Sequence, residues 1–328
     1  QVAAVALSAG ALARRCAAAL RLSHLVVTNT SDSDPQVAGA VKGFVGAGSG
    51  LRWVVLNADD PAAGGLLADL DPDVRVALFG STPFPPLGWR HDIWVGLRAL
   101  HPLRRGVRLA VVAAGGVVGG GAAQNAELQV GLLGASNATN LLAVLAVLLS
   151  RGLALPPALH ALAKVHGVPG RLEGFGGEQA PLVAVDGAQT PDALARAIAN
   201  LRHHTSGRLL TVFGCRGGGE PGQRARLGAV AEAGSDLVIV TDNDPGSEDG
   251  DRIIADILGG MRRPECARVE RQRGLAIRIA LTLAGASDSV LVAGKGHATT
   301  QDMGELKVRF SDRAQVAQAL REWTEGRR

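Results

Sequence analysis

Apolar runs that end in short polar segments alternate with stretches of helical spacing through the second half of the chain. Four such runs predict buried strands, at residues 181–187, 208–215, 236–244 and 289–296. Helical spacing predicts helices that begin at Pro191, cover about 224–233 and 251–261, and close the chain at 314–324. Strands that alternate with helices are typical of a parallel, doubly wound sheet, in which ligands bind beyond the carboxyl ends of the strands. The pattern therefore predicts a Rossmann-like α/β fold.

The first half of the chain has a less regular pattern. Residues 25–30 and 53–61 are apolar runs that end in polar turns, which predicts two parallel strands. Residues 35–46 between them have the spacing of a crossover helix. From about 74 to 133, glycine-rich turns separate short strands. This last pattern suits an antiparallel insert or edge strands.

A continuous apolar face predicts a long helix from about residue 137, which Asn137 or Thr139 can cap and Gly152 can end. A second helix is predicted at 156–167. The Val-Pro-Gly segment that follows is typical of a linker. We therefore predict two domains, at residues 1–167 and 168–328.

The composition supports two α/β domains and argues against a nucleic-acid partner. A chain of 328 residues can form two hydrophobic cores. The chain is 47% hydrophobic but has no Tyr. Its cores must therefore be filled by Ala, Val and Leu, which suits helices packed on a parallel sheet. The net charge of +4 comes mostly from scattered Arg, so no nucleic-acid-binding surface is predicted.

The 3 cysteines are odd in number and lack the spacing of metal ligands. This argues against a disulfide framework and favours a reducing cytoplasm. The apolar run at 141–149 is too short to cross a bilayer, and no membrane association is predicted.

Polar loops follow each of the four strands predicted in the second half. The glycine-rich loop at 214–222 could hold a phosphate or carboxylate through backbone N–H groups, or it could be only a turn. Thr190 and Pro191 have the residue types of a helix cap and first turn. Taken singly, a residue such as Arg171 is more typical of an exposed surface than of a ligand site, and His297 is more typical of a structural than of a catalytic histidine.

Six segments occur in one order and at plausible spacing: NATN at 137–140, GRLE at 170–173, DGAQTPDAL at 186–194, FGCRGGGEPGQR at 213–224, TDNDPGSED at 241–249 and AGKGH at 293–297. With them the chain resembles the Mur ligase family, most closely the UDP-N-acetylmuramoyl-tripeptide synthetase type. The resemblance implies a partial central ATPase-type domain followed by a complete C-terminal domain. It also implies nucleotide-binding residues, namely Asn137, Asn140, Arg171, Asp186 and Arg224. The substrate-binding residues that it implies are Asp242, Asp244, Gly294, Lys295 and His297.

A fainter resemblance covers residues 1–60. Ser8, Thr28 and Asn29 fall at substrate-binding positions of the family, and Lys42 falls at the position of a catalytic Lys. In the family this Lys is carbamylated and helps to place a second magnesium ion. A single Lys on a helix is otherwise a solvated side chain. The family's metal-binding Glu is replaced near Ala6, so we assign no metal ligand.

Several positions depart from the family pattern. Asp244 and Gly246 stand where diaminopimelate-adding enzymes hold the far carboxylate of that amino acid with an Asn and an Arg. Gly cannot form an Arg–carboxylate clamp, and an additional Asp repels a carboxylate, so diaminopimelate is disfavoured. Ala298 replaces a Glu that accepts the substrate amine. Gly187 and Gln189 replace a Tyr and a His beside the nucleotide.

The resemblance implies an ADP-forming ligase of peptidoglycan synthesis that uses ATP and Mg²⁺. Its substrates would be an amino acid and a UDP-N-acetylmuramoyl-peptide or a related carboxylate. No phosphate-binding loop of the G-x-x-G-K-[ST] type occurs in the sequence. The chain alone is therefore expected to be inactive: it is a piece of a longer protein, a protein that never had this loop, or one that obtains it from a partner subunit.

Two other classes of protein stay open at this point. One is a catalytically inactive paralogue that acts as a binding or scaffolding subunit, which the altered metal, nucleotide and amino-acid positions favour. The other is a divergent ligase for a different amino acid in secondary metabolism, which the retained Lys42, Arg171, Asp186, Arg224 and Lys295 favour. An NAD-binding Rossmann protein comes only third, because no G-x-G-x-x-G segment opens a first βα unit in this sequence.

Overall fold

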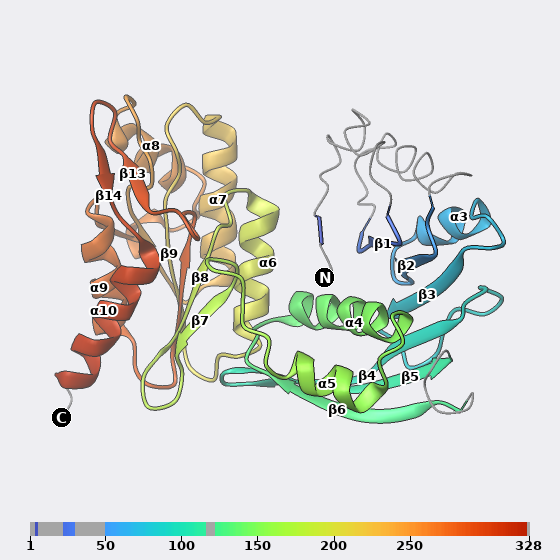
Figure 1. Ribbon diagram of the computed structural model, residues 1–328. Coiled ribbons are helices and arrows are strands. Elements are labelled where there is room, and N and C mark those ends of the chain that lie inside the picture. Colours follow the sequence, from blue (N-terminus) through green and yellow to red (C-terminus); the bar gives the residue numbers. More distant parts are fainter. Residues whose placement is uncertain (1–3, 6–21, 30–49, 116–121, 327–328) are drawn as a thin grey trace. The chain divides into compact units, whose positions relative to one another are not determined.

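The computed structural model describes residues 4–5, 22–29, 50–115 and 122–326 (Figure 1). The chain forms two compact units. We call the first the N-terminal unit, which consists of Gln1–His101, Arg108–Val130 and Ser136–Lys164. The second is the C-terminal unit, which consists of Pro102–Val107, Gly131–Ala135 and Val165–Arg328. Two short segments from the first half of the chain therefore pack with the second half.

The N-terminal unit contains a six-stranded sheet in the order β1-β2-β3-β4-β5-β6. Its strands are β1 (His24–Val27), β2 (Trp53–Asn57), β3 (Arg75–Gly80), β4 (Ile93–Leu103), β5 (Gly106–Gly115) and β6 (Gln124–Val130). The two predicted parallel strands are confirmed, because β1 pairs in parallel with β2. Strand β3 pairs in parallel with both β2 and β4 and is not an antiparallel or edge strand, so the prediction for residues 74–133 is wrong there.

Helix α3 (Ala63–Ala68) covers one face of this sheet. Alternate residues of β2 and β3 point to that face, since side chains alternate along a strand. The resulting core contains Val54, Leu56, Val76 and Leu78 from the strands, with Ala63, Leu66 and Leu67 from the helix.

Helix α4 (Ala135–Ser150) confirms the predicted long helix but starts before Asn137, so neither Asn137 nor Thr139 is its cap. Its end agrees with the prediction. Gly152 has a φ of 89°, and its N–H donates to the carbonyl of Leu149. A glycine in this conformation is a common end of a helix. Helix α5 (Leu155–Leu162) follows and is shorter than predicted.

The C-terminal unit contains a second six-stranded sheet, in the order β11-β10-β9-β12-β8-β7. Its strands are β7 (Glu173–Gly176), β8 (Leu182–Asp186), β9 (Leu209–Phe213), β10 (Leu237–Val240), β11 (Arg268–Val269) and β12 (Ser289–Ala293). All neighbours are parallel except β7, which runs antiparallel to β8 at the edge. The four predicted strands are confirmed, and their carboxyl ends lie at one edge of the sheet.

Helices cover both faces of the C-terminal sheet, which confirms the doubly wound fold (Figure 1). One core joins Leu182 and Leu209 to α6 (Pro191–Arg202), α7 (Pro221–Gly234) and α8 (Gly250–Leu258). The alternate residues Val183 and Leu210 belong to the opposite core, with α9 (Arg273–Leu283) and α10 (Asp312–Glu325). Smaller elements are the 3₁₀ helix η2 (Pro264–Cys266) and the hairpin of β13 (Thr300–Asp302) and β14 (Lys307–Arg309).

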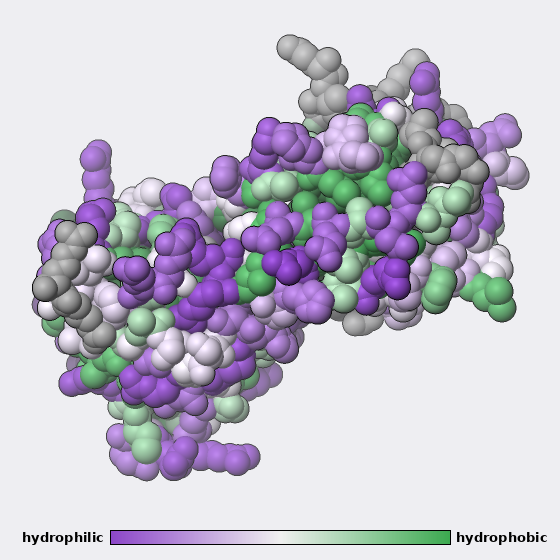
Figure 2. Space-filling view, turned by 90° about the horizontal axis from the view of Figure 1, so that it is seen from below, coloured by the Kyte–Doolittle hydropathy of each residue, from purple (hydrophilic) through white to green (hydrophobic). Residues whose placement is uncertain are grey.

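No helix in the described ranges is long and apolar enough to cross a membrane. On the face that Figure 2 shows, hydrophilic residues cover most of the C-terminal unit, at the left, with hydrophobic residues scattered between them.

Candidate functional site

The carboxyl edge of the C-terminal sheet brings four polar loops together, as the sequence predicts. They follow β8, β9, β10 and β12, whose parallel pairing places their carboxyl ends side by side. The loops after β9 and β10 are joined directly, because the Gly217 N–H donates to the Asp244 carbonyl over 2.9 Å. This edge is therefore one surface built from segments up to about a hundred residues apart.

Asp244 and Lys295 form a partly buried ion pair at this edge. The Lys295 Nζ lies 2.7 Å from Asp244 Oδ1, and the exposed fractions of the two side chains are 0% and 12%. The Asp302 N–H donates to the same oxygen over 3.0 Å. The Arg216 Nε donates to the other oxygen, Oδ2, over 3.3 Å. Both carboxylate oxygens are thus occupied by donors of the protein itself.

These donors also set the protonation of Asp244. Burial works to raise the pKa of its carboxyl group, but the hydrogen bond from Lys295, the Asp302 N–H and the charge of Arg216 together hold that pKa below its usual range. Asp244 is therefore ionised at neutral pH and neutralises the charge of Lys295.

Arg224 is enclosed by carboxylates of the same edge. Its Nη1 and Nη2 donate to the two oxygens of Glu248, each over 2.7 Å, and Nη1 also donates to Asp256 over 2.9 Å. The guanidinium is positively charged, and its hydrogen bonds lower the pKa of Glu248 to about 2. Nη2 also donates to the Arg216 carbonyl. The structure thus places Arg224 beside the glycine-rich loop, with both terminal nitrogens already paired.

Arg171 and Asp186 lie next to each other at the end of β8. Asp186 accepts hydrogen bonds from the Leu172 and Ala188 N–H groups, each over 2.8 Å. A Cβ on Gly187 would lie 2.8 Å from Arg171 Nη1, so the guanidinium covers this glycine. The Arg171 side chain is exposed and makes no ion pair within the described ranges. An exposed guanidinium beside an ordered carboxylate can bind phosphate and hydroxyl groups of a nucleotide.

Three glycines allow the backbones of three loops to cross beside this pair. A Cβ on Gly170 would overlap the backbone of Gly296 and His297. A Cβ on Gly296 would lie 2.8 Å from the Gly170 carbonyl oxygen and 2.9 Å from the Gly187 Cα. The segments GRLE, DGAQ and GKGH therefore meet at Gly170 and Gly296, where a side chain would overlap the backbone of a neighbouring loop.

The other predicted residues of this unit take different positions. Asp242 is buried and forms an ion pair with Arg271, with 3.0 Å between Arg271 Nη2 and Asp242 Oδ2. The Asp242 carboxylate is thus used in a contact within the protein. His297 is exposed. Gly294 packs against Asn243, whose side chain is 1% exposed.

In the N-terminal unit, the structure describes four predicted residues. Thr28 and Asn29 are exposed at the end of β1, and the Thr28 carbonyl accepts a hydrogen bond from Asn57 over 2.9 Å. Asn137 and Asn140 lie in the first turns of α4, with 3.5 Å between Asn140 Nδ2 and Asn137 Oδ1. Ser8 and Lys42 lie outside the described residues.

Three charged residues of the carboxyl edge were not singled out in the sequence: Arg216, Glu248 and Asp256. Arg216 stands in the glycine-rich loop itself, which is a signal that sequence reasoning could have used. Glu248 and Asp256 are 24 and 32 residues from Arg224, and only the folded loops show that they bind it.

The described residues do not gather three or more His, Cys, Asp or Glu side chains that could hold a metal ion. Arg171 and Asp186 offer a cation and a carboxylate, groups that can contact the phosphates and hydroxyls of a nucleotide.

Comparison with known proteins points to one family. Residues 170–296 match the family described as Mur ligase, glutamate ligase domain. A relative from Alkalilimnicola ehrlichii, named UDP-N-acetylmuramoyl-L-alanyl-D-glutamate–2,6-diaminopimelate ligase, is 39% identical over 325 residues, which are 97% of this chain and 62% of the relative. A relative of the same name from Xanthomonas oryzae is 39% identical over 283 residues, which are 86% of this chain and 54% of the relative. The chain thus spans little more than half the length of such relatives.

A solved structure of a ligase with this name has a TM-score of 0.70 and 25% sequence identity. The match covers 97% of this chain and 64% of that structure. The predicted resemblance and the Rossmann-like α/β fold are therefore confirmed.

Proposed function

Since this chain belongs to the Mur ligase family, we propose that it serves an ATP-dependent, ADP-forming ligase that adds an amino acid to a UDP-N-acetylmuramoyl-peptide or a related carboxylate. The similarity over 325 residues to a named ligase of this kind is the observation that carries the proposal. We further propose that residues 1–167 correspond to the central domain and 168–328 to the C-terminal domain. The reaction would belong to peptidoglycan synthesis in the cytoplasm.

The proposed reaction has two steps. A carboxylate oxygen of the acceptor attacks the γ-phosphorus of ATP, which releases ADP and leaves an acyl phosphate. The amine of the amino acid then attacks the acyl carbon, the amide C–N bond forms, phosphate leaves, and the amine loses a proton. Mg²⁺ would supply neutralisation of phosphate charge. Catalysis in such a reaction rests mainly on positioning and on charge neutralisation.

Within this proposal the residues of the carboxyl edge have separate roles. We assign Arg171 to a phosphate group and Asp186 to a hydrogen bond from a nucleotide hydroxyl. The guanidinium of Arg171 over Gly187 and the Asp186 carboxylate fixed by the Leu172 N–H support these roles. Arg224, which resemblance assigns to the nucleotide, is instead proposed to fix the glycine-rich loop through Glu248 and the Arg216 carbonyl. Lys42, Asn137 and Asn140 keep their predicted roles as proposals.

The proposed amino acid lacks a distal carboxylate. In diaminopimelate-adding relatives the corresponding loop is expected to hold that carboxylate with an Asn and an Arg. Here the carboxylate of Asp244 is already bound by Lys295, Arg216 and the Asp302 N–H. A second carboxylate at the same place would be repelled by Asp244, and Gly246 offers it no cation.

The test is an assay of the chain and of its longest natural form with Mg-ATP, a UDP-N-acetylmuramoyl-dipeptide and single amino acids. We expect ADP release only when both the acceptor and an amino acid are present, and a product that is heavier by one amino-acid residue. Arg171→Ala should reduce the rate, and the exposed control Arg226→Ala should not. The longest natural form, shown to be folded, would contradict the proposal if it formed no ADP with any amino acid.

The amino-acid choice has its own test. The double variant Asp244→Asn/Gly246→Arg removes the repelling carboxylate and adds a guanidinium. Nothing lies within 4 Å of a Cβ on Gly246, although its φ of 61° will strain the new side chain. We expect this variant to accept diaminopimelate better than the parent protein. Equal use of diaminopimelate by the two proteins would contradict the role of Asp244.

A further inference from the structure

The C-terminal unit contains two segments that lie far from its main part in the sequence, Pro102–Val107 and Gly131–Ala135. Both are held by the end of α6. His204 Nδ1 lies 2.7 Å from the Leu103 carbonyl oxygen, and the Gly134 N–H donates to His204 Nε2 over 2.9 Å. Beside them, the Ala135 N–H donates to Asn200 Oδ1 over 2.9 Å. One imidazole ring therefore connects both segments to α6.

The two contacts fix the tautomer of His204. A carbonyl oxygen can only accept a hydrogen bond, so Nδ1 must carry the proton. A backbone N–H can only donate, so Nε2 must be the acceptor and must carry no proton. The ring is 5% exposed, so water cannot replace either partner without movement of the chain. A second proton on Nε2 would face the Gly134 N–H and break that bond.

The side chain of Arg104 anchors the first segment independently. Its guanidinium donates to the carbonyls of His204, Ala286 and Asp288 over 3.1, 2.7 and 2.6 Å, and to the Ser289 hydroxyl over 3.2 Å. These acceptors line the amino edge of the sheet, opposite the candidate site. Arg104 therefore keeps Leu103 beside His204 while the imidazole is neutral.

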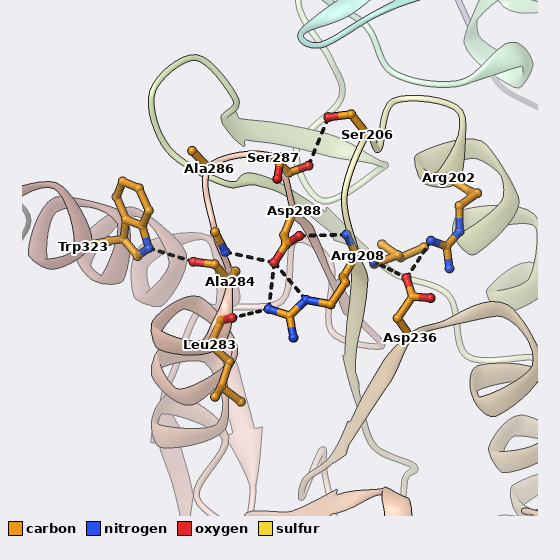
Figure 3. A network of polar contacts seen from close by, with 12 residues as sticks. Arg202, Ser206, Arg208, Asp236, Leu283, Ala284, Ala286, Ser287, Asp288 and Trp323 are labelled. Atoms are coloured by element: carbon orange, nitrogen blue, oxygen red, sulfur yellow. Dashed lines mark hydrogen bonds and ion pairs between the residues drawn. The ribbon is translucent and has the colours of Figure 1, made fainter.

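The loop that receives Arg104 is itself fixed by a polar network (Figure 3). Asp288 accepts hydrogen bonds from the Arg208 backbone N–H over 2.7 Å and from its guanidinium over 2.9 Å. Ser206 donates to the Ser287 carbonyl, and Trp323 donates to the Ala284 carbonyl over 3.2 Å. The acceptors for Arg104 are thus held in place by contacts that do not involve His204.

Every charge that faces the imidazole disfavours a second proton. Burial lowers the pKa of His204, and nearby His203 and Arg104 lower it further, while the hydrogen bond to the Leu103 carbonyl acts in the opposite direction. The negative charge of Asp288 interacts with Arg104. The Asp288 carboxylate itself accepts a hydrogen bond from Arg208. The native state therefore prefers the neutral ring.

We propose that His204 is a pH-sensitive anchor, which binds residues 102–107 and 131–135 to the end of α6 while it is neutral and releases residues 131–135 when it is protonated. The folded state disfavours a second proton on His204. The anchored state therefore has its full stability above pH 6.5, the ordinary pKa of histidine, and loses stability as the pH falls below that value. Each pH unit below 6.5 should raise the population of the released state about tenfold, until the native ring itself takes up a proton.

The test is amide hydrogen exchange of the full chain between pH 7.5 and 5.0, with each rate divided by the intrinsic rate at that pH. We expect the protection of the Gly134 amide to fall at least about tenfold over this range, while amides of β8 keep theirs. His203→Gln should still show a fall, although a smaller one, because His203 makes neither contact and only adds to the lowering of the His204 pKa. His204→Gln should show protection that no longer depends on pH. Unchanged protection of Gly134 in the parent protein would overturn the proposal, as would the same fall in His204→Gln.

A second measurement needs no variant. Nitrogen chemical shifts of the imidazole rings, followed by NMR in the parent protein, report the tautomer and the pKa of each ring. We expect one ring to carry its proton on Nδ1 and to titrate below 6.5 together with the Gly134 amide signal. If no ring has this tautomer, or if the Gly134 amide does not respond to its titration, the proposal is wrong.

Discussion

Asp244 and Lys295 join the loop after β10 to the loop after β12 through a partly buried ion pair. Family resemblance assigns both to the substrate, and 51 positions separate them. In the fold, their ammonium and carboxylate groups are paired with each other. A residue pattern can predict that a side chain lies at the end of a strand, because the side chain follows the apolar run that forms the strand. It cannot show which of two nearby opposite charges will already be neutralised.

Lys295→Met should destabilise the protein by about 2 to 4 kcal/mol, because a partly buried carboxylate loses its main partner. Urea unfolding measures this loss. Lys307→Met is the matched control: its Nζ lies 3.9 Å from Asp302 and its side chain is 72% exposed, so the cost should stay below about 0.5 kcal/mol. The double variant Lys295→Met/Asp244→Leu should recover part of the loss. Equal costs for the two single Lys variants would show that burial of the pair is unimportant.

The Asp244 carboxyl group should also contribute to acid sensitivity. Its pKa is lower in the folded state than the ordinary value of 3.8, so its contribution to the free energy of unfolding is present above that value and disappears as the pH falls through the folded pKa. Asp244→Asn lacks this titration. We expect the difference in unfolding free energy between parent and variant to be constant from pH 7 to pH 5 and smaller at pH 3. A difference that grows toward pH 3 would contradict the lowered pKa.

At the scale of elements, β4 and α9 were missed for identifiable reasons. Strand β4 contains Gly96 and Pro102, which are rare inside strands, yet Gly96 is required because a Cβ there would overlap the Thr82 carbonyl. Helix α9 begins with Arg273, which looks like a surface residue in the sequence. In the fold it is fully buried against Asp312, with Nε 2.7 Å from Oδ1. Both cases depend on partners that are distant in sequence.

The loop crossing at the carboxyl edge predicts a strong dependence on glycine. Gly170→Ala combines a φ of 66° with overlap against Gly296, so we expect a loss of more than about 2 kcal/mol and displacement of the loop after β12. Gly218→Ala is the control, because its φ of 71° is similar but nothing lies within 4 Å. It should cost only about 1 to 2 kcal/mol. Thermal unfolding of both variants checks this difference.

At the scale of the whole molecule, the alternation of strands and helices was enough to predict the C-terminal fold. It did not predict that residues from the first half of the chain also belong to the C-terminal unit. Leu133 is 3% exposed in its core, and Arg104 satisfies carbonyls at its amino edge, although both belong to the first half of the chain. Short segments of this kind carry no periodic pattern long enough to reveal where they pack.

A protein that consists of residues 165–328 alone should therefore be less stable than the same residues within the full chain. It lacks Leu133, whose burial contributes about 2 kcal/mol, and it leaves three carbonyl acceptors of Arg104 to water. Urea unfolding followed by circular dichroism measures the difference. Addition of residues 131–164 should restore the Leu133 part of the loss. Identical midpoints for the short chain and the full chain would contradict the division into units.

The contact between Trp323 and the Ala284 carbonyl gives the protein a built-in optical reporter. The chain has no Tyr and 4 Trp, and Trp323 is the single Trp after residue 94. Replacement of Trp53, Trp89 and Trp94 by Phe would leave one indole, beside the loop that receives Arg104. The emission of that single indole would then follow the loop in real time and without an attached dye.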